Sequence, residues 1–145
     1  MDVSPRQNPA YRLSLHAMKR RLWIALLVLY AAAIFVVSHR SVSVGEPPFP
    51  HVDKLLHAAE FALFFALAWK ATNRRFALSA LLTVAYAGTD ELHQLFVATR
   101  TASALDFGAD LVGALLAALL LTFGGRLWAV LRARILRPSH SEVES

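Results

Sequence analysis

Four apolar blocks separated by short polar segments constrain the fold of this chain more than any other feature of its sequence. The blocks span residues 22–38, 55–69, 76–89 and 111–123. Several are shorter than the ~20 residues that a helix needs to cross ~30 Å of hydrocarbon, but each becomes long enough when its polar flank is included. No block alternates as a membrane strand does, and hydrocarbon excludes backbone without internal hydrogen bonds. The sequence therefore predicts an all-α polytopic membrane protein with four transmembrane helices.

The positions of Lys and Arg predict the orientation of these helices. Twelve of the 15 precede the first block, fill the 70–76 connection or follow the last block, and the others are Arg40, Lys54 and Arg100. Positive residues are retained in the cytoplasm, so both termini and the 70–76 loop are expected inside. The loops that contain Arg40 and Arg100 are then expected outside.

Three parts follow from this topology. Residues 1–19 are predicted to be a cytoplasmic tail, residues 20–130 the four-helix transmembrane domain, and residues 131–145 a second cytoplasmic tail. A signal peptide over residues 1–38 is the competing interpretation of the first block. It is disfavoured because the apolar run exceeds the roughly 7–15 residues of a signal-peptide core and lacks a small-x-small cleavage site.

Composition excludes several kinds of site. The chain has no cysteine, which excludes disulfides, thiolate nucleophiles and thiolate metal sites. The formal charge of +5 could indicate a nucleic-acid partner, but the positive residues gather at one set of helix ends. The expected partners are therefore membrane lipid and a ligand at the membrane, and no nucleic acid; nothing in the sequence indicates the oligomeric state.

Ionisable residues at the opposite helix ends indicate a site. Six carboxylates lie at or just inside the ends of the apolar segments: Asp53, Glu60, Asp90, Glu91, Asp106 and Asp110. An ionisable group inside a membrane segment costs roughly 2.5–3.5 kcal/mol, so it usually faces a protein interior or a water-filled cavity. Helical spacing places them, with His57, His93 and Gln94, on polar faces at similar depth. We expect three helices to bring these faces together in an outward-facing pocket.

The predicted cluster is short of positive charge. Six acids face Lys54, Arg100 and two histidines that are mostly neutral at pH 7. Shared protons, a cationic ligand or a divalent metal could each neutralise the excess, and the sequence leaves these alternatives open. The i, i+3 pairs His57–Glu60 and Asp90–His93 are the candidate metal ligands, since carboxylate and imidazole suit Zn²⁺ or Mn²⁺.

Other residues are assigned candidate roles by their chemistry. His57 and Glu91 are the best general acid/base candidates if a reaction occurs. Lys54 and Arg100 suit a phosphate or carboxylate, and Arg adds bidentate geometry. The predicted ligand-binding set is Asp53, Lys54, Asp90, His93, Gln94, Arg100, Ser103, Asp106 and Asp110.

The same residues also allow a purely structural interpretation. Asp53 and Asp106 lie near helix N-termini, where a carboxylate favours the positive end of the helix dipole. Lys54 with Asp53, or Glu91 with Arg100, could tie helix ends together. Ser103 is expected to cap a helix, and Gly113 and Ala117 are expected to permit close contact between helices.

Four ordered motifs resemble a known family. They are Asp53-Lys54-x-x-His57, Asp90-Glu91-x-x-Gln94, Arg100-x-x-Ser103-x-x-Asp106 and Asp110-x-x-Gly113. Over roughly residues 34–123 the chain is similar to the VanZ-like family of small bacterial membrane proteins. Members typically carry Asn at the position of Asp110 and a Pro-Gly pair at Ala98-Thr99. The resemblance implies a multi-pass protein of the bacterial inner membrane and a link to low-level teicoplanin resistance, but it supplies no reaction.

The leading hypothesis is an inner-membrane protein whose outward pocket handles a lipid-linked or glycan-linked ligand of the cell envelope. A metal-assisted hydrolase or transferase acting on a lipid head group is the first alternative, and a small scaffold that modulates partner proteins is the second. A transporter is disfavoured, because no internal repeat is present and the inner half of the spans lacks polar groups.

Overall fold

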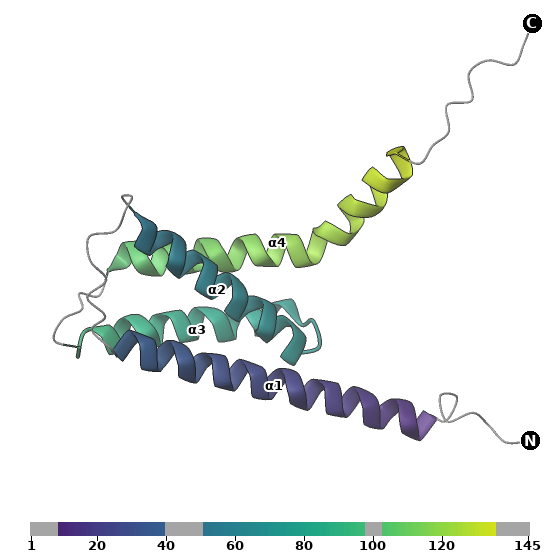
Figure 1. The fold of residues 1–145 in the computed structure, drawn as a ribbon, viewed down its shortest axis with the longest axis horizontal. Coiled ribbons are helices and arrows are strands. Elements are labelled where there is room, and N and C mark those ends of the chain that lie inside the picture. The colour runs from purple at the N-terminus through teal and green to yellow at the C-terminus, as the bar shows by residue number, and fades with distance from the viewer. Residues whose placement is uncertain (1–8, 40–50, 98–102, 136–145) are drawn as a thin grey trace, which may run out of the picture.

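The described part of the chain is entirely helical. The computed structural model describes residues 9–39, 51–97 and 103–135, and Figure 1 shows their arrangement. The helices are α1 (Pro9–His39), α2 (Val52–Ala71), α3 (Phe76–Gln94) and α4 (Ala104–Ile135). This confirms the predicted all-α class, and it places the start of each later helix within a few residues of the predicted position.

Antiparallel packing separates two chemically different ends. At one end of the bundle α1 and α3 finish while α2 and α4 begin (Figure 1). We call this the acidic end, and its carboxylates are Asp53, Asp90, Glu91, Asp106 and Asp110. The other end is the basic end, defined by Lys19, Arg20, Lys70, Arg74 and Arg75. There Lys70 of α2 lies over the Trp23 ring of α1, 5.9 Å from its centroid.

The α2 helix forms the centre of the core. Phe61 and Phe64 pack with Ile34 of α1 and Ala87 of α3. On another side of α2, Phe65 packs against a cluster of small residues on α4 that includes Ala117. Large aromatic side chains on one helix facing small ones on its neighbour allow the axes to come close.

Gly113 marks the closest approach of α2 and α4. A Cβ atom at this position would lie 1.8 Å from the backbone oxygen of Ala58, a contact that no side-chain movement could relieve. Only glycine permits this separation, since it has no Cβ. The predicted role of Gly113 as a small contact residue is confirmed.

Two helix boundaries differ from the expected ones. Residues 9–19, expected to form a tail, belong to α1, and α4 continues beyond residue 130 to Ile135. Both extensions contain Ala, Leu and Arg, which favour helix even where no packing holds them. Whether either tail is cytoplasmic stays a prediction.

Among the described residues, two helices are long and apolar enough to cross a membrane, over Ala10–His39 and Ala104–Gly125. The α2 helix does not meet this criterion, and it carries Asp53, Lys54, Glu60 and Lys70 within its 20 residues. The four-span topology with both termini inside therefore stays a prediction.

Candidate functional site

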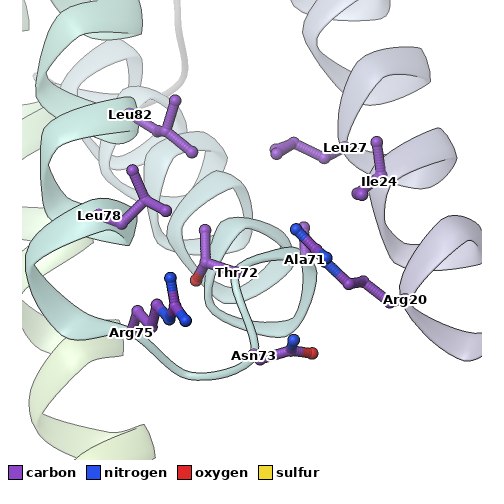
Figure 2. Close-up of a pocket in the computed structure, with 9 residues that line it drawn as sticks. All are labelled: Arg20, Ile24, Leu27, Ala71, Thr72, Asn73, Arg75, Leu78 and Leu82. Carbon is purple, nitrogen blue, oxygen red and sulfur yellow. The ribbon is translucent and has the colours of Figure 1, made fainter. Parts of the chain in front are cut away.

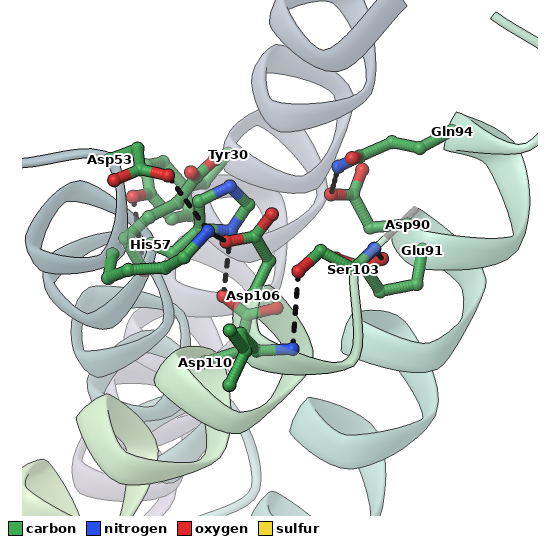
Figure 3. Close-up of polar contacts among 12 residues, drawn as sticks. Tyr30, Asp53, His57, Asp90, Glu91, Gln94, Ser103, Asp106 and Asp110 are labelled. Carbon is green, nitrogen blue, oxygen red and sulfur yellow. Dashed lines mark hydrogen bonds and ion pairs between the residues drawn. The ribbon is translucent and has the colours of Figure 1, made fainter. Parts of the chain in front are cut away.

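The first turns of α2 and α4 meet through one lysine. Lys54 of α2 donates one hydrogen bond to Asp53 Oδ2 at 2.8 Å and another to Asp106 Oδ1 of α4. Figure 3 labels the two carboxylates, Asp53 and Asp106. The Lys54–Asp53 ion pair expected in the structural interpretation is present, and the contact with Asp106 extends it across two helices. Lys54 is thus already bound to two carboxylates of the protein.

One turn deeper, an imidazole meets a buried carboxylate. His57 Nδ1 of α2 lies 3.0 Å from Asp110 Oδ1 of α4. The Asp110 side chain is fully buried and His57 is 13% exposed. The next residue, Ala58, is the one that contacts Gly113, so the close approach of the helices brings this pair within hydrogen-bonding distance.

The third carboxylate comes from α3. Glu91 Oε2 accepts the backbone N–H of Ser103 at 2.9 Å. The Ser103 hydroxyl in turn accepts the backbone N–H of Leu105 at 3.2 Å, which is the geometry of a helix N-cap. The capping role predicted for Ser103 is therefore confirmed, and Glu91 is fixed beside the beginning of α4 (Figure 3).

Three helices converge on one small volume. His57, Glu91 and Asp110 each offer a possible metal-ligating atom, and these atoms all lie within 4.8 Å of one another. Within the described ranges, Glu91 Oε1 and Asp110 Oδ2 are buried without a hydrogen-bond partner. Both acid/base candidates, His57 and Glu91, therefore lie close to Asp110.

The metal ligands expected from the sequence are distributed differently. Of the four, only His57 belongs to the group above. Asp90 Oδ2 accepts a 3.0 Å hydrogen bond from Gln94, and both side chains are buried. His93 Nε2 lies 3.3 Å from His39 Nδ1 of α1. Glu60 is half-buried, and its backbone oxygen accepts the Tyr30 hydroxyl at 3.2 Å.

His39, the last residue of α1, also lies at the acidic end, where its side chain is exposed and contacts His93. Phe35, one turn earlier in α1, also contacts His93, and the centroids of the two rings lie 4.4 Å apart. The sequence indicated this contact in only one way: His39 and His93 lie at the ends of two helices that run in the same direction. Arg100, which together with Lys54 was expected to suit a phosphate or carboxylate, lies outside the described residues.

An apolar groove adjoins the acidic end between α3 and α4. It has a volume of about 350 Å³ and is lined chiefly by Leu92, Leu95 and Phe107. Glu91 and Ser103 supply its polar wall. Glu91 is thus the one carboxylate among the lining residues of the groove.

A second cavity lies at the basic end and has opposite chemistry. Figure 2 shows this space of about 340 Å³ between α1 and α3, with Arg20 and Arg75 at its rim and leucines further in. Both arginines are exposed. None of the described residues predicted from the sequence to form a site lies here.

Comparison with known proteins gives one match. Residues 5–128 match the family model described as VanZ/LLP1. No match was found among curated proteins or solved structures. Together with the two long apolar helices, the family match indicates a membrane protein.

Proposed function

The chain belongs to the VanZ/LLP1 family, and from this premise we propose that it is a bacterial inner-membrane protein that handles an amphiphilic ligand of the cell envelope. The ligand is lipid-linked or glycan-linked, and it binds at the acidic end with that end facing outward. Family membership supports the further proposal that this activity lowers susceptibility to a glycopeptide such as teicoplanin.

The groove between α3 and α4 is the observation that carries this proposal. Its leucine and phenylalanine walls suit a hydrocarbon chain, whereas Glu91 and Ser103 suit a polar head group. Concave sites that combine apolar walls with a few fixed polar groups are the usual form of a small-molecule site. The cavity at the basic end has no acidic residue among its lining residues.

Filling the groove tests the proposal. Gly88 lines the groove, and a Cβ there would meet nothing within 4 Å, so Gly88→Leu is expected to fold. Gly124, far along α4, is equally open and provides the matched control Gly124→Leu. The chain would be expressed in a teicoplanin-susceptible bacterium and the minimum inhibitory concentration measured. We expect the wild type and Gly124→Leu to raise the minimum inhibitory concentration, and Gly88→Leu to leave it unchanged. Equal protection by all three proteins would contradict the proposal.

The acidic end itself is tested by charge removal. We expect Asp90→Ala and Glu91→Ala to abolish protection while the protein still accumulates in the membrane, because their role is in the site. Arg74→Ala and Arg132→Ala should change protection little, since single exposed charges contribute little. If Asp90→Ala prevents accumulation, the purely structural interpretation of the polar network is correct.

A metal-assisted hydrolase or transferase acting on a lipid head group is the second candidate. The meeting of His57, Glu91 and Asp110 favours it over a scaffold, because a scaffold does not require buried carboxylates beside an imidazole. Incubation of purified protein with cell-envelope lipid extracts would distinguish the two, since only an enzyme changes the head groups.

A further inference from the structure

We propose that His57, Glu91 and Asp110 bind one divalent transition-metal ion, with Zn²⁺ or Mn²⁺ as the fitting chemical class. The inference rests on the proposed function only in that it concerns the same pocket. It replaces the sequence-based ligand pairs, which lay within single helices, by a set drawn from α2, α3 and α4.

The donor geometry is nearly assembled. The three ligand atoms lie within 4.8 Å of one another, and the His57–Asp110 pair is at 3.0 Å. Bonds of about 2.0–2.2 Å to a tetrahedral ion place donors roughly 3.3–3.6 Å apart. The donors therefore need to come slightly closer together to bind one ion, and Glu91 is partly exposed whereas Asp110 is fully buried.

Two unsatisfied oxygens point to a missing partner. Asp110 is fully buried, and its Oδ2 has no hydrogen-bond partner among the described residues; the same holds for the buried Oε1 of Glu91. Buried polar atoms are almost always satisfied, so each exception requires an explanation. Both exceptions belong to the same three-residue group, and a shared cation would satisfy both at once.

Charge leads to the same conclusion. A divalent ion bound by two carboxylates and one imidazole leaves the group without net charge, because an imidazole that ligates a metal is neutral. Without a cation, two neighbouring carboxylates in a partly dry site repel each other and lose hydration. The nearest described lysine cannot serve, because Lys54 is bound to Asp53 and Asp106 at the entrance.

The chemistry of the donor atoms limits which divalent ions the site would bind. Imidazole with carboxylates suits Zn²⁺ and Mn²⁺, whereas Ca²⁺ and Mg²⁺ prefer oxygen ligands alone. The ligands come from three helices, so the site exists only in the folded protein, and binding must stabilise the fold by mass action.

The experiment measures how much metal the purified chain binds. The chain would be purified in detergent with a tag that lacks histidine, stripped with a chelator, and titrated separately with Zn²⁺, Mn²⁺ and Mg²⁺. Bound metal would be quantified by mass spectrometry and unfolding temperature recorded. We expect about one Zn²⁺ or Mn²⁺ per chain, a higher unfolding temperature, and no comparable shift with Mg²⁺.

Near-isosteric variants locate the site. Asp110→Asn, Glu91→Gln and His57→Gln should each weaken binding by at least about 100-fold, since loss of supporting partners alone costs 10–100-fold. The matched control is His16→Gln, which removes an exposed histidine of α1 near the basic end. Size-exclusion profiles would verify that each variant is folded.

Three outcomes overturn the inference. They are absence of bound metal in wild type, equal binding by the three site variants, and loss of binding in His16→Gln. Failure of the proposed function would appear separately, because metal is measured without lipid and Gly88→Leu should keep its metal.

Discussion

The acidic and basic ends carry similar numbers of charged side chains but use them differently. At the acidic end, charges contact each other across helices, as in Lys54 with Asp106 and His57 with Asp110. At the basic end, Arg20 and Arg75 are exposed at the rim of an open cavity (Figure 2). The position of the charged side chains therefore distinguishes the two ends more than their number does. At the acidic end they contact one another within the fold, and at the basic end Arg20 and Arg75 face the surroundings of the protein.

The largest contrast is expected in which side of the membrane each end faces. The chain has no cysteine, so single cysteines can be introduced freely. If the acidic end faces outward, Thr101→Cys should react with an impermeant thiol reagent in intact cells, and Asn73→Cys at the basic end should react only after lysis. The reverse pattern would place the site on the cytoplasmic side.

The next largest effect should come from the contact that holds the acidic end together. Gly113→Ala should destabilise the protein by about 3 kcal/mol or more, because the added Cβ would overlap the Ala58 backbone and force α2 and α4 apart. Thermal unfolding in detergent measures the loss. Gly108→Ala is the control on the same helix, where a Cβ meets nothing within 4 Å. Equal stability of both variants would contradict the close approach.

An intermediate loss of stability is expected from replacing a lysine of α2, and its size should differ between the two ends of the helix. Lys54→Met should destabilise by roughly 1–3 kcal/mol, the cost of leaving charged hydrogen-bond partners without their donor. Lys70→Met, at the other end of the same helix, loses only a cation–π contact with Trp23 and should cost roughly 0.5–1 kcal/mol. Denaturant unfolding compares them, and a larger loss for Lys70→Met would reverse the comparison between the ends.

The smallest effect is expected at the basic rim. Arg20→Gln should change stability by less than about 0.5 kcal/mol, because the side chain is exposed and its charge is screened. Thermal unfolding at low and high salt checks this. A large, salt-dependent loss would mean that this end also uses its charge for folding.

Helix positions could be predicted because they depend on local signals. The apolar blocks, Ser103 as a cap and Gly113 as a small contact residue are all visible along the chain. The pairing of site residues was not visible in this way. Spacing within a helix suggested His57 with Glu60, whereas the structure brings His57 to Asp110 and Glu91. That convergence depends on how α2 and α4 rotate about their axes, which the packing of Ala58 on Gly113 sets.

Glu91 receives its hydrogen bond from the main chain of Ser103, twelve positions later. Every residue except proline supplies that N–H, so substitution at position 103 would cost the N-cap, about 1 kcal/mol, but would leave the bond to Glu91 intact. The bond therefore depends on where the main chain of position 103 lies, and not on which side chain stands there.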